Sequence, residues 1–126
     1  MAVVYLASSL ALAALELLVH IDHERALSTH VAIPVDFDET LILTVAQDSL
    51  PENWSRPEAL VQTRALGDAW LRSKASVLLR VPSVIIPAEN NYLFNPQHPD
   101  ALVVRTGEPE TFRYDPRLLK TDSKKT

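Results

Sequence analysis

The chain has 126 residues, of which 47% are hydrophobic and 22% are charged, and its formal net charge is −4. This length and composition predict one globular domain with a core of its own. The acidic balance argues against a nucleic-acid-binding surface, which needs clustered basic residues. The chain contains no cysteine, which excludes disulfides and thiolate metal sites and fits a reduced, cytoplasmic setting.

The N-terminal segment predicts a strand followed by a helix. Residues 3–7 are rich in β-branched and aromatic side chains, as strands are. Ser8 or Ser9 then offers a helix N-cap, and apolar residues at helical spacing continue to about Ile21. Because nearly every side of this helix is apolar, we expect it to be buried.

Glu16 is the one charged residue in the apolar run 10–19. An ionised carboxylate is costly to bury without partners, so a chain that keeps one there has either a partner or a use for it. His20 lies one helical turn further on, close enough to be that partner. Both residues also interrupt the run, which argues against a membrane span, and the lack of a preceding Lys or Arg argues against a signal peptide.

The remaining elements predict an α+β fold, because strands outnumber helices and do not alternate with them regularly. We expect a single domain over residues 1–118, built on a small mixed or antiparallel sheet with a buried N-terminal helix and a second helix. We expect strands at 31–33 and 41–45 that could form a hairpin, followed by a helix at 58–73 with Gly67 at a close contact. Two further strands are expected at 77–79 and 83–86, split by Pro82, and a loop at 90–99. A last hairpin around Gly107 and a polar, disordered tail at 119–126 complete the expected elements.

Four segments carry a resemblance to a known family. They are Val4-Tyr5-Leu6-Ala7, then Ala14-Leu15-Glu16 with His20, then Leu50-Pro51-x-x-Trp54, then Val81-Pro82-Ser83 running through Pro87-x-Glu89-x-Asn91-Tyr92-Leu93-x-Asn95-Pro96-x-His98-Pro99. In this order and spacing, over about a hundred residues, they resemble the RES-domain family, toxins of bacterial toxin–antitoxin systems.

The resemblance implies a fold, a substrate and a partner. The family is named for an Arg, a Glu and a Ser, of which Glu16 and Ser83 match the last two. The family's Arg lies upstream of the position of Tyr5, so the resemblance implies a chain shortened at its N-terminus. Such proteins resemble ADP-ribosyltransferases, consume NAD by transfer or degradation, and are blocked by an Xre-type antitoxin.

Two readings stand for each of the two matched residues. Glu16 is either satisfied by His20 or backbone donors, or it acts when the nicotinamide bond breaks. In the second case it supplies negative charge to an oxocarbenium-like ribose, orients the ribose hydroxyls or activates the acceptor, and the sequence does not separate these three roles. Ser83 either satisfies backbone groups beside Pro82, or hydrogen-bonds the nicotinamide amide or its ribose. No His–acid pair is placed to activate Ser83, which argues against a covalent nucleophile.

Three further residues fall in the matched segments. Tyr5 is either a core aromatic or a stacking surface for nicotinamide or adenine, and Asn91 and Asn95 are either turn residues or part of an NAD-binding pocket. The four histidines form no metal-binding pattern, so no metal site is predicted.

The leading hypothesis is therefore an NAD-cleaving toxin with Glu16 and Ser83 in its site. The alternative is a catalytically impaired RES-like module that binds the antitoxin without turnover, and a structural domain without a ligand is a third. We expect no direct nucleic-acid or membrane partner. A homodimer is possible, because an N-terminal edge strand would leave apolar surface open beside Tyr5.

Overall fold

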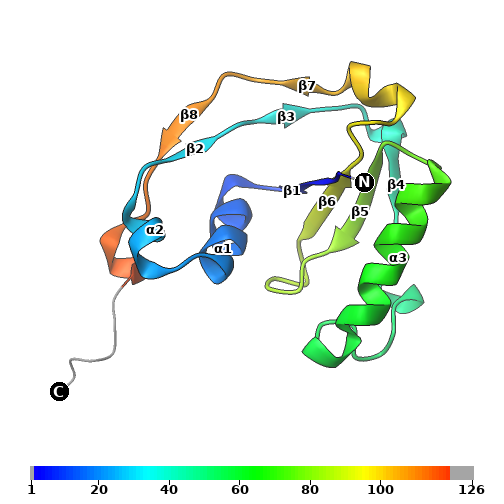
Figure 1. The fold of residues 1–126 in the computed structure, drawn as a ribbon, viewed down its shortest axis with the longest axis horizontal. Helices are drawn as coiled ribbons and strands as arrows, with labels where there is room; N and C mark the ends of the chain where they lie inside the picture. Colours follow the sequence, from blue (N-terminus) through cyan, green and yellow to red (C-terminus); the bar gives the residue numbers. More distant parts are fainter. Residues whose placement is uncertain (1, 120–126) are drawn as a thin grey trace.

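The computed structural model describes residues 2–119, and its centre is a four-stranded mixed sheet (Figure 1). The strand order is β1-β6-β5-β4, in which β4 and β5 are parallel and the other neighbours antiparallel. The strands are β1 (Val4–Ala7), β6 (Asn90–Phe94), β5 (Leu78–Pro82) and β4 (Ile42–Thr44). Together with the helices this is the α+β fold that the sequence predicts.

The described residues form three α-helices: α1 (Leu10–His20), α2 (His23–Leu27) and α3 (Leu60–Ser73). The expected N-cap of α1 is confirmed, since the Ser9 hydroxyl oxygen accepts a hydrogen bond from the Leu12 amide at 3.1 Å. Helix α3 covers one face of the sheet, where Trp70 and Leu71 are buried against Leu79. This packing forms the larger part of the core around the central strands.

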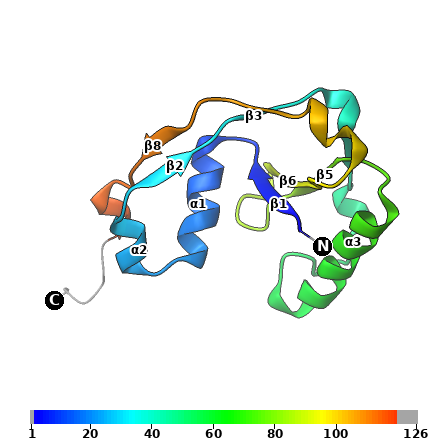
Figure 2. The same cartoon turned by 45° about the horizontal axis from the view of Figure 1, so that its top comes forward.

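A long two-stranded ribbon arches over α1 and β1 (Figures 1 and 2). It consists of β2 (His30–Ala32) paired with β8 (Glu110–Phe112), and β3 (Val35–Asp36) paired with β7 (Arg105–Thr106), all antiparallel. A second core lies where the ribbon meets the helices and holds Ala26, Tyr114 and Leu119. Leu119 therefore belongs to the fold and not to the tail, whose residues 120–126 lie outside the described part of the chain.

Several predicted strands and pairings differ from the structure. Residues 90–94, expected as a loop, form the central strand β6, whereas 83–86, expected as a strand, form a loop. The predicted hairpins are absent from the described residues, because β2 pairs with β8 and β4 pairs with β5. These partners are far apart in sequence, so local turn signals do not reveal them.

The burial of α1 also differs from the expectation. Only Leu12 is buried on this helix, while Leu10, Leu17 and Val19 are exposed. The all-round apolar pattern predicted the burial of α1 wrongly, because a cleft between the ribbon and the helix leaves one side of the helix, with Leu10 and Leu17, open. Among the described residues, no helix is long and apolar enough to cross a membrane.

Candidate functional site

Glu16 and Ser83 meet between α1 and the end of β5. The Ser83 hydroxyl donates a hydrogen bond of 2.9 Å to Oε2 of Glu16. Ser83 is fully buried and Glu16 is half-buried. Glu16 lies one turn beyond the buried Leu12, so the same side of α1 that packs inward also carries the carboxylate.

The loop after β5 holds the Ser83 hydroxyl in one orientation. Its oxygen accepts hydrogen bonds from the amides of Ile85, at 3.1 Å, and Ile86, at 3.0 Å. The Ser83 amide donates to the Glu89 carbonyl at 2.9 Å, which closes the loop. A hydroxyl has one donor and two acceptor positions, and all three are used here. The geometry therefore favours a Ser83 that holds Glu16 over one that contacts nicotinamide or ribose directly.

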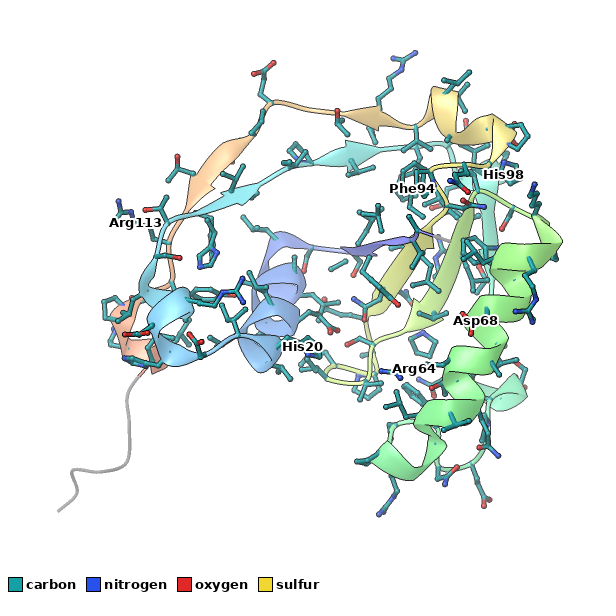
Figure 3. All side chains as sticks on the ribbon, viewed as in Figure 1. His20, Arg64, Asp68, Phe94, His98 and Arg113 are labelled. Atoms are coloured by element: carbon teal, nitrogen blue, oxygen red, sulfur yellow. The ribbon has the colours of Figure 1, made fainter. Side chains whose placement is uncertain are left out.

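The partner of Glu16 is thus a hydroxyl and not the expected histidine. His20 is exposed at the C-terminal end of α1, where Figure 3 labels it, and it makes no hydrogen bond or ion pair with Glu16. Among the described side chains, no Lys or Arg makes an ion pair with Glu16. Within the described residues, the hydrogen-bond partner of this carboxylate is therefore a neutral hydroxyl and not a cation.

The same loop is also tied to the start of α1. The Ser8 amide donates to the Asn90 carbonyl at 3.0 Å, and the Ser9 hydroxyl lies 3.4 Å from Oε1 of Glu89. A carboxylate at a helix N-terminus is favourably placed against the helix dipole. Helix α1 is therefore fixed against the loop both at its first turn and at Glu16.

Asn91 lies on β6 near this pair, whereas Tyr5 lies on the adjacent strand β1 and lines a cleft that Glu16 and Ser83 do not line. Asn91 is opposite Val81, two residues before Ser83, and its Nδ2 lies 3.4 Å from the Leu6 carbonyl oxygen. Tyr5 is two residues before Ala7, which is the cross-strand partner of Asn91, so Tyr5 and Asn91 share one face of the sheet. The Tyr5 side chain is 74% exposed and is not the core aromatic of the alternative reading.

Asn95 lies at the other end of the β5–β6 hairpin. Its amide donates to the Val77 carbonyl, and its Oδ1 accepts from the Gln97 amide at 3.0 Å. Val77 is six residues before Ser83 along an extended strand, which corresponds to roughly 20 Å. The structure therefore does not bring Asn95 together with Glu16 and Ser83. Of the two roles considered for Asn95, its contacts are those of a turn residue.

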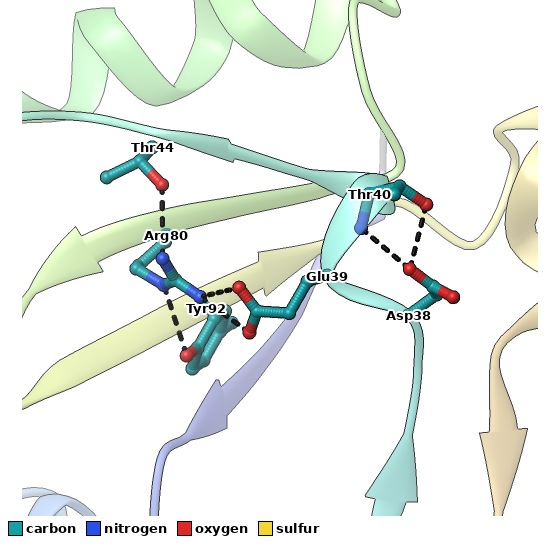
Figure 4. Close-up of polar contacts among 6 residues, drawn as sticks. All are labelled: Asp38, Glu39, Thr40, Thr44, Arg80 and Tyr92. Atoms are coloured by element: carbon teal, nitrogen blue, oxygen red, sulfur yellow. Dashed lines mark hydrogen bonds and ion pairs between the residues drawn. The ribbon is translucent and has the colours of Figure 1, made fainter.

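Arg80 is a polar centre that the sequence reading did not single out. Its guanidinium donates to the Tyr92 hydroxyl at 3.2 Å and to Oε2 of Glu39 at 3.1 Å, with Thr44 beside it (Figure 4). The hydrogen bonds to Tyr92 and Glu39 raise the pKa of Arg80 above its ordinary value. Arg80 is the one charged residue in the otherwise apolar segment 77–82, and the same pattern drew attention to Glu16. This pattern could therefore have identified Arg80 from the sequence.

Arg80 does not join the Glu16–Ser83 pair. Side chains alternate along β5, so Arg80 lies on the opposite face from Leu79 and Val81. Leu79 and Val81 belong to the cluster under α3, which places Arg80 on the side of the sheet away from α3.

A separate cleft lies between α1, β1 and the ribbon. Its volume is about 450 Å³, and its α1 wall consists of Leu10, Ala13, Ala14 and Leu17. Glu16 and Ser83 do not line it, because they lie on the other side of the helix. In the part of the chain that the structure describes, no group of three or more His, Asp or Glu side chains is arranged to hold a metal ion.

The comparisons with known proteins identify the family of this chain. A family model described as the RES domain matches residues 1–115. The chain belongs to the RES-domain family. The fold brings together Glu16 and Ser83, the two residues that the resemblance in the sequence analysis matched to the family's Glu and Ser, although 67 positions separate them in sequence.

Curated relatives include three proteins whose names describe toxins. A Toxin Res of Yersinia enterocolitica is 38% identical, covering 93% of this chain and 78% of the relative. A Toxin Res of Pseudomonas putida is 40% identical, covering 93% and 79%. A Prs ADP-ribosylating toxin of Sphingobium is 34% identical, covering 94% and 76%. This RES-domain chain therefore matches most, but not all, of each relative.

Proposed function

We propose that this chain is a toxin that cleaves NAD at the nicotinamide–ribose bond. The observation that carries the proposal is the hydrogen bond between Ser83 and Glu16, which orients one carboxylate without neutralising it. The names of the relatives support it: several are called toxins, and one an ADP-ribosylating toxin.

The chemistry of NAD cleavage needs one such carboxylate. The bond between ribose C1′ and the nicotinamide nitrogen breaks, and its electron pair leaves with the nicotinamide, which becomes neutral. Because this leaving group needs no proton, the second carboxylate of ordinary glycosidases is not required. The ribose passes through an oxocarbenium-like cation, which a nearby negative charge stabilises. An acceptor then adds to C1′ and loses its proton.

The roles of the residues follow from their contacts. Glu16 supplies the negative charge, with Oε2 anchored by Ser83 and no hydrogen bond to Oε1 among the described residues. Ser83 is a positioning residue, because its hydroxyl is fully used by Glu16 and two backbone amides. Tyr5 presents an exposed aromatic ring for stacking, and Asn91 lines the same face of the sheet.

Product analysis tests this proposal. The chain is incubated with NAD, and nicotinamide release is followed by chromatography. ADP-ribose as the second product identifies water as acceptor, ADP-ribose-1-phosphate identifies phosphate, and mass added to a protein identifies transfer. The proposal is contradicted if the folded chain releases no nicotinamide above the rate in buffer.

A second candidate is a module that binds an Xre-type antitoxin without turnover. It is favoured by one observation: no Lys or Arg among the described side chains hydrogen-bonds Glu16 or Ser83, and Arg80 lies on the other face of the sheet. An NAD pyrophosphate without a cationic clamp would be held weakly. Calorimetric binding to an Xre-type protein, together with no nicotinamide release, would favour this candidate over the enzyme.

A further inference from the structure

Three adjacent strands bring Arg80, Thr44 and Tyr92 to one point on the sheet. In the strand register, Arg80 of β5 is opposite Thr44 of β4 on one side and Tyr92 of β6 on the other. Cross-strand partners carry their side chains on the same face. The Arg80 guanidinium accordingly donates to the Tyr92 hydroxyl at 3.2 Å and to the Thr44 hydroxyl at 3.4 Å (Figure 4). The sheet itself therefore fixes the relative positions of a cation and two hydroxyls.

This cluster has more hydrogen-bond donors than acceptors. A guanidinium has five N–H donors and no acceptor, and each hydroxyl has one donor of its own. The Tyr92 and Thr44 oxygens accept from Arg80, but in the described part of the chain neither hydroxyl donates to a protein group. Besides these two oxygens, the acceptor that Arg80 has among the described residues is the Glu39 carboxylate. The cluster therefore suits a ligand that is rich in acceptor oxygens.

Glu39 is a replaceable partner of Arg80. Its two carboxylate oxygens lie 3.2 and 3.1 Å from the same guanidinium nitrogen, Nη2. The Glu39 side chain is 80% exposed, whereas that of Arg80 is 23% exposed. An exposed ion pair contributes little to stability, so a competing anion can replace this carboxylate at low cost. The neighbouring Asp38 does not compete for Arg80, because its Oδ1 accepts from the amide and the hydroxyl of Thr40 (Figure 4).

The ring of Tyr92 is held from two sides. It packs edge-on against Phe37 with 5.5 Å between the ring centroids, and the Arg80 guanidinium lies over it at 5.5 Å from the centroid. Both contacts are favourable for an aromatic ring and restrict its orientation. A donor that is already in position loses less conformational freedom when a ligand binds.

We propose that Arg80, Tyr92 and Thr44 bind a phosphate group, which takes the place of the Glu39 carboxylate. The guanidinium fork matches the spacing of phosphate oxygens, and a phosphate offers the two hydroxyls more acceptor oxygens than a carboxylate does. Inorganic phosphate and the phosphate of a nucleotide share this chemistry. The site is separate from the Glu16–Ser83 pair, so the proposal does not rest on NAD cleavage.

A small phosphate-bearing molecule fits this site better than a nucleic acid. The net charge of the chain is −4, which repels a polyanion, and binding to a nucleic-acid backbone needs several clustered cations. A single phosphate group needs only the one guanidinium that the cluster provides.

Titration of the full chain tests the proposal without relying on turnover. Inorganic phosphate and ADP are added separately at low ionic strength, and binding is followed by calorimetry and by the NMR signal of the Arg80 Nε–H group. We expect saturable binding of at least one probe together with a shift of that signal. Phosphate that binds as tightly as ADP, or more tightly, assigns the site to the free anion, whereas tighter binding of ADP assigns it to a nucleotide.

Two variants remove donors from the cluster. Arg80→Gln should lower the affinity by about tenfold or more, because a hydrogen bond to a charged group is lost. Tyr92→Phe keeps the ring against Phe37 and removes only the hydroxyl, and it should lower the affinity by about tenfold for the same reason. Tyr92→Phe decides the question if Arg80→Gln does not fold.

Two further variants each release a guanidinium from its carboxylate. Glu39→Gln removes the competing charge and should raise the affinity by about two- to fivefold. Asp115→Asn is the matched control, because Asp115 forms an exposed ion pair with Arg117 at 2.7 Å, and no described hydroxyl hydrogen-bonds that guanidinium. We expect Asp115→Asn to bind both probes as the unmodified chain does.

The proposal is overturned by any of four results. Neither probe shifts the Arg80 signal, or the donor variants bind the probes as tightly as the unmodified chain. Alternatively, Glu39→Gln leaves the affinity unchanged, or Asp115→Asn raises it as much as Glu39→Gln does.

Discussion

Ser83 donates a 2.9 Å hydrogen bond to Glu16 across 67 positions of sequence. Two backbone amides fix the oxygen of that hydroxyl, so its proton has one direction in which to point. The result is a carboxylate that is oriented by a neutral partner. An ion pair with Lys or Arg would orient the same group but weaken its attraction for a developing sugar cation.

Removal of the Ser83 hydroxyl should destabilise the fold. Ser83→Ala leaves the amides of Ile85 and Ile86 without their acceptor in a half-buried loop, which costs about 1–3 kcal/mol of unfolding free energy. Urea denaturation measures the loss. Ser28→Ala is the control, because that hydroxyl is exposed and donates only to the Arg25 carbonyl. If both substitutions lowered the free energy of unfolding by the same small amount, the role of the Ser83 hydroxyl in holding this loop would be contradicted.

Ser83 should carry no covalent intermediate. Both acceptor positions of its oxygen are occupied by backbone amides, so the oxygen is not available to attack C1′. Intact-mass spectrometry of the chain quenched during NAD turnover checks this point. An ADP-ribosyl adduct located on Ser83 would show that the hydroxyl is a nucleophile and would refute its positioning role.

The two glycines should respond to alanine with opposite signs. A Cβ at Gly67 would lie 3.6 Å from Leu93, an ordinary contact, so the expected close packing is not there. Gly67→Ala should stabilise α3 by about 0.5–1 kcal/mol. A Cβ at Gly107 would lie 2.7 Å from the rigid ring of Pro34. Gly107→Ala should therefore cost about 1–3 kcal/mol. Thermal unfolding of both variants tests this, and effects of the same sign would contradict it.

Tyr114 should contribute stability that alkali removes. Its hydroxyl donates to the Ala14 carbonyl of α1, and burial raises the pKa of the Tyr114 phenol above its ordinary value. The unfolded chain releases this proton at lower pH than the folded chain does, so the contribution is complete below about pH 10 and falls as pH rises further. Tyr114→Phe should cost about 0.5–1.5 kcal/mol at pH 8.

The pH dependence of that difference is the check on Tyr114. Urea denaturation of the unmodified chain and Tyr114→Phe is compared at pH 8 and at pH 10.5. We expect the two stabilities to approach each other at the higher pH, because the phenylalanine variant has no proton to lose at this position. A difference that grows with pH would mean that the folded state favours the ionised phenol.

Local signals accounted for the elements that the sequence predicted correctly. The strand at Val4–Ala7, the Ser9 cap and α3 each depend on neighbouring residues, whose propensities and spacing are visible in the chain. The predicted strand at 83–86 was wrong for an equally local reason. Its apolar run resembles a strand, but the Ser83 hydroxyl captures two amides and turns the backbone.

Long-range pairings were beyond these signals. Strand β6 is rich in asparagine and was read as a loop, yet it becomes the central partner of β1 and β5. Its cross-strand neighbours override its weak propensity. The Glu16 side chain likewise stands out because it is charged in an apolar run, but the sequence offered only His20 or backbone donors as its partner. Only the folded chain brings Ser83 to it.

The central claim is that Ser83 acts on NAD cleavage through Glu16. Nicotinamide release is measured for the unmodified chain, Glu16→Gln, Ser83→Ala and the double variant, with Glu24→Gln on α2 as a control for loss of an exposed carboxylate. Each single substitution in the pair should lower the rate per folded molecule by about 10²–10³-fold. The double variant should be little slower than Glu16→Gln alone, because the two residues act as one unit. The account is contradicted if the rate loss of the double variant equals the product of the two single losses, or if the unmodified chain releases no nicotinamide.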